Sequence, residues 1–228
     1  MTTTLLTPTA ISAGLHTQAL PRTIVCHGTV GTTMDLAREL LKTVPEDAAP
    51  VMVTAEEQTA GRGRMGRSWV APAGSALLFS IGFRPRWLTA PQTAALVWMA
   101  ATALCDGIRS VAGVAAGLKW PNDVLLPIAG GYGKTAGILI EVVYEGDRPA
   151  TAIIGCGINV SAAPPPELTR YPATSIVAAA GRPIDRLELL RACLVQLDYW
   201  YTQLRGGAIP ALQQAWSERL IGVARQPV

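Results

Sequence analysis

The sequence predicts an α+β domain in which helices pack on a mixed β-sheet. Its 228 residues are 50% hydrophobic, so the chain can bury one sizeable core without metals or disulfides. Segments with helical periodicity alternate with pairs of adjacent strand-like segments, whereas a repeating βαβ fold would alternate helices with single strands. No internal repeat or linker interrupts the chain. These observations favour a single globular domain.

The first half of the chain contains two predicted helices and two predicted strands. Threonines precede the first helical pattern and can cap it, and Pro45 ends it. Pro91 stands in the first turn of the second helical pattern, where proline is tolerated. The expected elements are a helix from Thr32 or Thr33 to Leu41, a strand centred on residues 51–53, a buried strand at residues 75–83 and a long helix at residues 89–111.

The second half of the chain is expected to form a hairpin followed by two helices. Pro121 stops a short strand. Two later runs rich in β-branched residues flank a turn at residues 145–149, and Asp185-x-x-Glu188 is a capping-box pattern that opens a helix. The expected elements are a strand at residues 118–120, a glycine-rich loop at 128–133, hairpin strands at 137–144 and 150–160, and helices at 185–204 and 210–220.

Composition excludes several classes of protein. The net charge of +3 and the charged content of 15% are too low for a dedicated nucleic-acid binder. The four cysteines form no Cys-x-x-Cys pair, which argues against a zinc site and predicts buried free thiols in a reducing cytoplasm. Residues 94–105, the longest apolar stretch, are fewer than the roughly 20 that span a bilayer, so we expect a buried helix there. Residues 1–23 lack a secretory signal pattern and are expected to be a flexible leader.

Residues 61–69, Gly-Arg-Gly-Arg-Met-Gly-Arg-Ser-Trp, combine glycines with three cations. Their Gly-x-Gly-x-x-Gly spacing matches a dinucleotide-binding turn, but that turn requires a helix directly after it. The residues that follow, Val-Ala-Pro-Ala-Gly, cannot form one. The guanidinium groups of Arg62, Arg64 and Arg67 match phosphate or carboxylate oxygens, and Trp69 offers a stacking face. The stretch is either an anion clamp on a flexible loop or a solvated basic turn.

Two further stretches contain a lysine beside polar residues. Lys-Trp-Pro-Asn-Asp at residues 119–123 can place a cation on phosphates and polar groups on a nucleotide, or form a turn. Gly-Lys-Thr at residues 133–135 is not a P-loop, because Ile128 occupies the position of the first glycine and a strand-like segment follows. Lys134 at the start of that strand can still reach an anion.

The fourth stretch, Gly-Cys-Gly-Ile-Asn at residues 155–159, ends an apolar strand. Glycines in a strand permit close approach by a flat ligand, and Asn159 can donate and accept hydrogen bonds, as an adenine edge requires. The alternative is a β-bulge with an asparagine turn.

Taken together and in this order, the four stretches resemble the catalytic domain of biotin protein ligases. The similarity extends over residues 24–220, and Lys-Trp-Pro-Asn-Asp separates the sequence from the related lipoate ligases. The resemblance implies a mixed, largely antiparallel sheet flanked by helices, similar to class II aminoacyl-tRNA synthetases. It also implies that biotin's carboxylate attacks the α-phosphate of ATP to give biotinyl-5'-AMP, and that a lysine of a biotin carboxyl carrier domain then takes the biotin.

The resemblance assigns roles to individual residues. The expected catalytic residues are Lys119, Lys134 and Arg64. The expected biotin-binding residues are Thr32, Thr33, Met34, Gln58, Arg62, Gly63, Arg64 and Lys134. The expected ATP- and adenylate-binding residues are Arg64, Arg67, Trp69, Lys119, Asn122, Asp123 and Asn159. Mg²⁺ is expected to enter with ATP, with Asp123 as a candidate side chain for the metal or the ribose. Residues 61–68 are expected to be mobile without biotin and ordered with it.

Three departures from the family pattern qualify these expectations. Thr32-Thr33-Met34 replaces the commoner Ser-Thr-Asn, which removes one polar contact to biotin's ureido group. No helix-turn-helix precedes the motifs, so we expect no nucleic-acid partner. Residues 221–228 stand where the family's small C-terminal β-barrel usually begins, and we expect that barrel to be absent. A cytoplasmic monomer or homodimer without membrane attachment is expected.

Three other functions compete with a biotin protein ligase. A lipoate or octanoate ligase or transferase belongs to the same superfamily. A binding module could retain biotinyl-adenylate without transferring it. A dehydrogenase is the most distant alternative, because no helix follows the glycines at residues 61–66.

Overall fold

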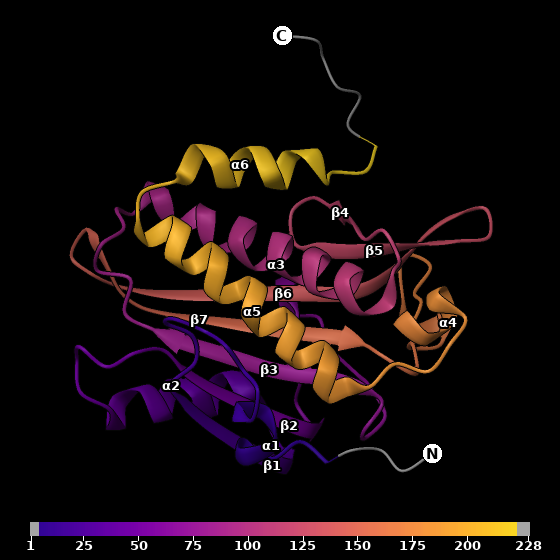
Figure 1. Cartoon of the computed structure of the whole chain (residues 1–228), viewed down its shortest axis with the longest axis horizontal. Helices are drawn as coiled ribbons and strands as arrows, with labels where there is room; N and C mark the ends of the chain where they lie inside the picture. Colours follow the sequence, from indigo (N-terminus) through magenta and orange to yellow (C-terminus); the bar gives the residue numbers. More distant parts are fainter. Residues whose placement is uncertain (1–4, 223–228) are drawn as a thin grey trace, which may run out of the picture.

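The computed structural model describes residues 5–222, which form a seven-stranded mixed sheet with helices on both faces (Figure 1). The strand order is β1-β2-β3-β7-β6-β5-β4; β1 and β2 pair in parallel and the other neighbours pair antiparallel. The predicted α+β class and the largely antiparallel sheet are therefore confirmed. The strands are β1 (Thr23–Val30), β2 (Val51–Gln58), β3 (Ala76–Phe83), β4 (Gly117–Lys119), β5 (Asp123–Ile128), β6 (Gly131–Glu145) and β7 (Arg148–Asn159).

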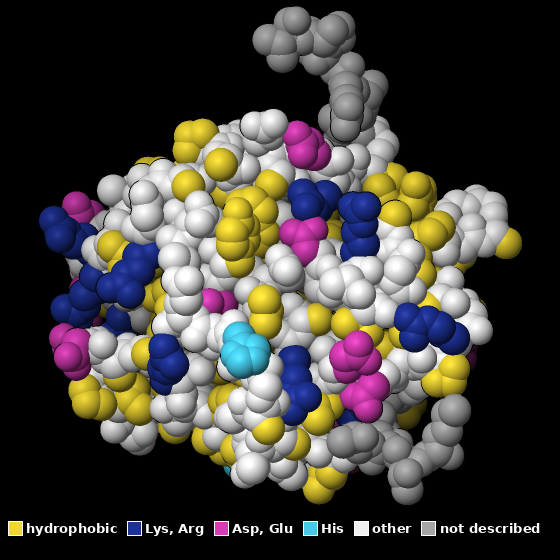
Figure 2. All heavy atoms as spheres, viewed as in Figure 1, with side chains coloured by type: hydrophobic (Ala, Val, Ile, Leu, Met, Phe, Trp, Pro, Cys, Tyr) yellow, Lys and Arg dark blue, Asp and Glu magenta, His cyan; other side chains and the backbone are white. Residues whose placement is uncertain are grey.

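The helices divide unequally between the two faces of the sheet. α3 and α5 lie side by side across one face, with α6 next to α3, and α2 packs on the other face (Figure 1). Figure 2 shows the face of α3 and α5, where basic, acidic and hydrophobic side chains are interspersed. The helices are α1 (Pro8–Ser12), α2 (Thr33–Thr43), α3 (Ala95–Ala112), α4 (Ile176–Ala180), α5 (Arg186–Arg205) and α6 (Ile209–Glu218), with 3₁₀ turns at Arg64–Gly66, Pro91–Ala94 and Pro166–Leu168.

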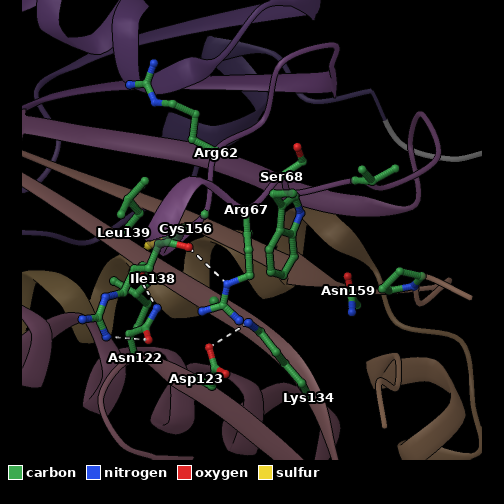
Figure 3. A pocket seen from close by; sticks show the side chains of 18 of the residues that line it. Arg62, Arg67, Ser68, Asn122, Asp123, Lys134, Ile138, Leu139, Cys156 and Asn159 are labelled. Carbon is green, nitrogen blue, oxygen red and sulfur yellow. Dashed lines mark hydrogen bonds and ion pairs between the residues drawn. The ribbon is translucent and has the colours of Figure 1, made fainter. Parts of the chain in front are cut away.

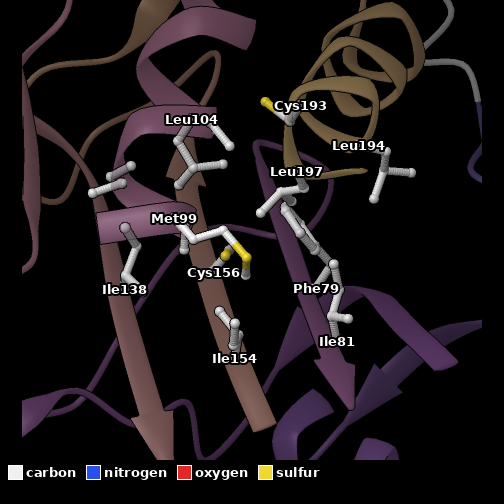
Figure 4. Close-up of a cluster of buried hydrophobic side chains, with 14 of the residues drawn as sticks. Phe79, Ile81, Met99, Leu104, Ile138, Ile154, Cys156, Cys193, Leu194 and Leu197 are labelled. Atoms are coloured by element: carbon white, nitrogen blue, oxygen red, sulfur yellow. The ribbon is translucent and has the colours of Figure 1, made fainter. Parts of the chain in front are cut away.

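The larger hydrophobic core lies between the sheet and the α3–α5 pair (Figure 4). Phe79 and Ile154 from the strands belong to the same buried cluster as Met99 from α3 and Leu197 from α5. Among the described residues, one helical stretch, Pro91–Ala112, is long and apolar enough by length and composition to cross a membrane, with a mean hydropathy of 1.3. It packs into this core, so the prediction of a buried helix is confirmed.

Capping residues place several elements where the sequence predicted them. Thr32 is the N-cap of α2, and its Oγ1 accepts a hydrogen bond from Met34 N at 3.4 Å. Asp185 caps α5 by accepting from Glu188 N at 2.9 Å. Gly146, with a φ of 63°, turns the β6–β7 hairpin. Because local hydrogen bonds define these boundaries, the sequence alone reveals them.

Two strands were not predicted, and one predicted loop is wrong. β1 is a half-exposed edge strand without clear alternation, and β5 follows Pro121 too closely for a separate pattern to emerge. The expected glycine-rich loop at residues 128–133 is instead a tight turn, because β6 already begins at Gly131. Gly130 has a φ of 79°, a value that glycine adopts without strain. Ala129 and Gly130 therefore form the two-residue turn of a hairpin.

The segment before β1 is not a flexible leader where the structure describes it. Residues 8–12 form α1, and Ile11 and Leu20 are fully buried in the main core. The carboxylate of Asp198 on α5 accepts hydrogen bonds from the backbone N–H groups of residues 18, 19 and 20, at 2.7, 2.6 and 2.7 Å. This segment has little periodicity of its own, so its position depends on a partner that lies distant in sequence. Residues 1–4 of the predicted leader lie outside the described residues.

Asp198→Ala is expected to lower the free energy of unfolding by about 1–3 kcal/mol, because three backbone donors lose a charged acceptor. Urea denaturation measures this change. Asp147→Ala, in the exposed β6–β7 turn, is the matched control and should leave stability within about 0.5 kcal/mol of the original. Equal stability of the two variants would show that residues 18–20 are not held as described.

The chain after α6 runs back beside β4. Leu118 N donates to Arg219 O at 2.7 Å, and Ile221 N donates to Leu118 O at 2.9 Å. Within the predicted C-terminal segment at residues 221–228, Ile221 thus adds to the sheet edge, and residues 223–228 lie outside the described residues.

Candidate active site

One pocket gathers nearly all the predicted site residues on the sheet face that carries α2. Side chains alternate between the faces of a strand, and Ile153 of β7 packs against α2, so Gly155 and Gly157 lie on that same face. The loop at residues 61–70 and the segment at residues 164–173 line the pocket on either side. The predicted residues that line it are Thr32, Thr33, Met34, Gln58, Arg62, Gly63, Arg64, Arg67, Trp69, Asn122, Asp123, Lys134 and Asn159.

The glycines of the pocket floor accommodate side chains of the protein itself. A Cβ atom at Gly157 would lie 2.4 Å from Trp69 Cε2, and one at Gly137 would lie 2.9 Å from Trp69 Cζ3. A Cβ atom at Gly155 would lie 2.8 Å from Met34 Sδ. The flat group against Gly137 and Gly157 is therefore the Trp69 indole, whereas Met34 fills the space at Gly155. A ligand beside Gly137 or Gly157 would have to lie on the far side of that indole.

One end of the pocket carries a chain of buried polar groups. Thr33 donates to Gln58 Oε1 from its backbone N at 2.8 Å and from Oγ1 at 3.0 Å. Ser80 Oγ lies 2.8 Å from Thr33 Oγ1, and because that hydroxyl proton is already given to Gln58, Ser80 must be the donor. This chain fixes the orientation of both pocket side chains. Ser80 is fully buried in β3, and nothing in its local sequence marks it as part of the site.

Cations converge at the centre of the pocket (Figure 3). Lys134 Nζ lies 2.7 Å from Asp123 Oδ1 and 5.7 Å from the centre of the Trp69 ring. Arg64 Nη1 donates to Asn122 Oδ1 at 3.3 Å. Asn122 is itself held by its Nδ2, which donates to Ile138 O at 2.7 Å. A ligand anion placed here would meet Lys134 and Arg64 together.

Arg67 completes this cationic centre from the loop. Its Nε donates to the backbone oxygen of Arg64 at 3.1 Å. Gly63 N donates to Arg67 O at 2.6 Å, so the loop folds back on itself between these two residues. Guanidinium groups held in this way present several donors in one plane, which matches phosphate oxygens.

Lys119 lies apart from the other predicted residues. Its Nζ lies 3.1 Å from the centre of the Tyr171 ring, and it does not line the pocket, although Tyr171 does. In the strand register, Lys119 of β4 lies opposite Asp123 of β5. Lys119 is therefore on the strand next to the ion pair of Lys134 and Asp123. Nothing in the sequence around Lys119 indicates the Tyr171 ring that it contacts.

Arg62 points away from the cationic centre (Figure 3). Its guanidinium pairs with both carboxylate oxygens of Asp35, at 2.9 Å each, and with Glu141 at 3.2 Å. These contacts lower the pKa of the Asp35 carboxyl, chiefly through the hydrogen bonds from Arg62, and raise the pKa of Arg62. The guanidinium expected to bind biotin is therefore bound to acidic side chains that the sequence did not single out.

Three buried side-chain atoms of pocket-lining residues have no hydrogen-bond partner within residues 5–222, and one of them is Arg62 Nε, on the guanidinium that pairs with Asp35 and Glu141. Asn159 Oδ1 and Trp69 Nε1 are buried and make no hydrogen bond there, whereas Asn159 Nδ2 donates to Thr174 O at 3.3 Å. An acceptor and a donor are thus available to a ligand that enters the pocket, because buried polar groups are normally satisfied.

Metal ligands and reactive thiols do not define this site. Among the described residues, no group of three His, Cys, Asp or Glu side chains could hold a metal ion. The four cysteines are free, as predicted, and three are buried. Burial raises the pKa of the Cys26 thiol to about 11 and that of Cys193 to about 12, so these thiols stay protonated and unreactive at neutral pH.

The fold and the pocket define a domain in which one pocket combines buried polar side chains, a cationic centre and an aromatic floor. The sequence model described as the biotin/lipoate A/B protein ligase family matches residues 30–159. The chain belongs to the biotin/lipoate A/B protein ligase family.

Named relatives agree with this family. The bifunctional ligase/repressor BirA of Bacillus subtilis is 34% identical over 222 residues, which cover 96% of this chain but 66% of that protein. The biotin–[acetyl-CoA-carboxylase] ligase of Paracoccus denitrificans is 37% identical over 186 residues, covering 79% of this chain and 75% of that protein. A solved biotin protein ligase from Leishmania major, in complex with biotinyl-5-AMP, superposes with a TM-score of 0.69 at 26% identity, covering 91% of this chain and 87% of that chain.

Proposed function

We propose that this protein is an ATP-dependent biotin protein ligase. It activates biotin to biotinyl-5'-AMP and then transfers biotin to a lysine of a biotin carboxyl carrier domain. The observation that carries the proposal is that Lys134 and Arg64 line one pocket together with the polar pair Thr33 and Gln58 and with the Trp69 ring. Similarity to ligases that act on biotin supports the choice of substrate.

The polar end of the pocket is suited to the biotin ring system. Thr33 and Gln58 hold each other in fixed orientations and can present hydrogen-bonding groups to a ureido ring. Met34, beside them, is 3% exposed and supplies an apolar surface where the family more often has asparagine. Arg62 contributes by positioning the loop rather than by contacting biotin, because its guanidinium is already paired with Asp35 and Glu141.

The cationic centre is suited to the first chemical step. A carboxylate oxygen of biotin attacks the α-phosphorus of ATP, the bond to the β-phosphate oxygen breaks, and pyrophosphate leaves. Both reactants are anions, and negative charge shifts to the leaving pyrophosphate. Lys134 brings the two together, Arg64 and Arg67 bind the phosphate oxygens, and preorganised cations of this kind stabilise the transition state.

The remaining roles concern adenine, the metal and the catalytic lysine. The Trp69 ring and the unpartnered Asn159 Oδ1 are suited to adenine, whose amino group is a donor. Mg²⁺ would supply positive charge to the ATP phosphates, and Asp123, which pairs with Lys134, would be the candidate carboxylate for that metal or for the ribose. Lys119 reaches the phosphates by leaving the Tyr171 ring.

In the second step, the lysine amine of the carrier domain attacks the biotinyl carbonyl and AMP leaves. The acceptor is thus an acyl-accepting protein rather than a nucleic acid or a membrane. The free cysteines fit a cytoplasmic protein, because thiols stay reduced in that compartment. We propose that it works there as a monomer or a homodimer.

Pyrophosphate release tests the first step. Purified protein with ATP and Mg²⁺ should release pyrophosphate when biotin is added, and not when lipoate or octanoate is added instead. Release with lipoate alone would favour the lipoate branch of the family, and release with neither acid would contradict the proposal.

Ser80→Ala is expected to weaken biotin binding about fivefold, since Thr33 loses the hydroxyl that orients it and a hydrogen bond is worth about 1 kcal/mol. Calorimetric titration with biotin measures the change. Thr54→Val is the matched control: it removes a buried hydroxyl from the neighbouring strand, where Oγ1 donates to Leu78 O at 2.9 Å. It should lose similar stability without losing affinity. Equal loss of affinity in both variants would mean that Ser80 acts only through stability.

A further inference from the structure

Four charged side chains form a closed network beside the pocket, where the loop at residues 61–69 meets α2 and β6. Arg62 pairs through two nitrogens with both carboxylate oxygens of Asp35, at 2.9 Å each, and also with Glu141 at 3.2 Å. Arg38 of α2 pairs with the same two carboxylates. A two-pronged pair between arginine and a carboxylate fixes direction as well as distance. The network therefore fixes how the loop leaves the sheet.

The base of this loop is held in two further ways. Arg62 and Ser68 form an isolated antiparallel bridge, and Trp69 N donates to Gly61 O at 2.9 Å. A Cβ atom at Gly61 would lie 2.4 Å from the backbone oxygen of Trp69, so the two arms are in close contact. The base has the hydrogen bonding of a short hairpin.

The tip of the loop has much less support. Met65 is 89% exposed and has a φ of 58°, which residues other than glycine rarely adopt. A hollow lined by residues 60–68 together with Leu139 and Glu141 lies against the loop. Arg64 and Arg67, which line the ligand pocket, belong to this tip, and Arg64 contacts Asn122 at 3.3 Å. The tip therefore lacks the carboxylate pairs that hold the base.

We propose that Asp35 and Glu141 are positioning residues that hold Arg62 and thereby latch the base of the loop. Only the tip, residues 63–67, then moves when ligand enters or leaves. This inference rests on the proposed function, in which the tip covers biotinyl-adenylate. Since α2 begins with the residues at the polar end of the pocket, the latch joins the biotin end to the lid over the phosphates.

Arg38 allows the effect of Arg62 on the loop to be tested without disturbing the packing of α2. It pairs with Asp35 and Glu141 by itself, so Arg62→Gln removes the loop's anchor and leaves the contact between α2 and β6 in place. If Arg62 bound ligand directly, Arg62→Gln would be far more damaging than Asp35→Asn/Glu141→Gln, which removes both partners of its guanidinium. If Arg62 is an anchor, these two variants have the same effect, and the triple variant that combines them adds nothing further.

Trypsin can test the latch in the ligand-free protein, because the loop carries one cleavage site at its base and two at its tip. In the original protein, mass spectrometry should show cleavage after Arg64 and Arg67 well before cleavage after Arg62. In the Asp35→Asn/Glu141→Gln variant, cleavage after Arg62 should become as fast as at the tip. Early cleavage after Arg62 in the original protein would overturn the proposal.

Glu39→Gln is the matched control for the proteolysis. Glu39 pairs with Lys42 on the exposed face of α2, at 2.7 Å, so this variant removes an acidic group from the same helix without touching the loop. Its cleavage pattern should match that of the original protein. Thermal unfolding should also be alike in all variants, and a changed pattern in Glu39→Gln would overturn the assignment to Asp35 and Glu141.

Release of biotinyl-adenylate tests the consequence for function. Protein loaded with biotin and ATP should release the adenylate on the order of tenfold faster in Arg62→Gln and in Asp35→Asn/Glu141→Gln, and the triple variant that combines these substitutions should release it no faster than either. A much larger effect of Arg62→Gln than of Asp35→Asn/Glu141→Gln would overturn the latch in favour of a direct ligand contact. If no variant forms adenylate, the proposed function fails, while the proteolysis still decides whether the base of the loop is latched.

Discussion

Lys134→Ala is expected to slow formation of biotinyl-5'-AMP roughly 100-fold, which corresponds to about 3 kcal/mol of lost transition-state stabilisation. Lys134 lies near both Asp123 and the Trp69 ring, where the biotin carboxylate and the α-phosphate would meet in the proposed reaction. Arg64→Ala is expected to act similarly, because Arg64 faces the same centre through Asn122. Single-turnover measurement of adenylate formation at saturating biotin and ATP isolates this step.

Lys42→Ala is the matched control for the lysine substitution. Lys42 lies on the exposed face of α2, and its charge is paired locally with Glu39. The control should form adenylate at the original rate. Near-normal rates in Lys134→Ala and Arg64→Ala would contradict the proposal that these cations stabilise the transition state of adenylate formation.

Gly157→Ala is expected to raise the KM for ATP at least tenfold. Its new Cβ would lie 2.4 Å from Trp69 Cε2, a distance that carbon atoms do not tolerate, and overpacking costs about 1–3 kcal/mol. Trp69 must move away from the sheet and into the space that adenine would occupy. Steady-state kinetics at varied ATP concentration, together with tryptophan fluorescence, would show both effects.

Gly28→Ala provides the comparison for Gly157→Ala. Gly28 also lies in a strand, but a Cβ atom there would meet nothing within 4 Å. This variant should keep the original KM for ATP and the original fluorescence. A Gly157→Ala protein that also kept both would show that the Trp69 indole is not fixed against β7.

The fold was predictable where local chemistry determines structure. Threonine and aspartate caps located α2 and α5, and the glycine at residue 146 located the long hairpin. β1 and the segment before it depend instead on distant partners, such as the carboxylate of Asp198 on α5. A pattern confined to neighbouring residues cannot show such contacts.

The site was predictable as a set of motifs but not as an arrangement. The glycines at residues 155 and 157 were associated with close approach by a flat ligand, but the protein's own Met34 lies against Gly155 and its own Trp69 indole lies against Gly157. Arg62 shares its motif with Arg64 and Arg67, but it turns toward Asp35 because α2 brings a carboxylate to the base of the loop. Three similar arginines differ in role because the fold gives each a different neighbour.

Transfer to a carrier domain is the most direct test of the proposed function. The purified protein, ATP and Mg²⁺ would be mixed with an unmodified biotin carboxyl carrier domain and either biotin or lipoate, and the carrier would be weighed by mass spectrometry. A carrier that gains one biotinyl group, and none from lipoate, is the predicted result. A carrier labelled by lipoate alone, or left unlabelled while biotinyl-adenylate accumulates, would contradict the assignment of this protein as a biotin protein ligase.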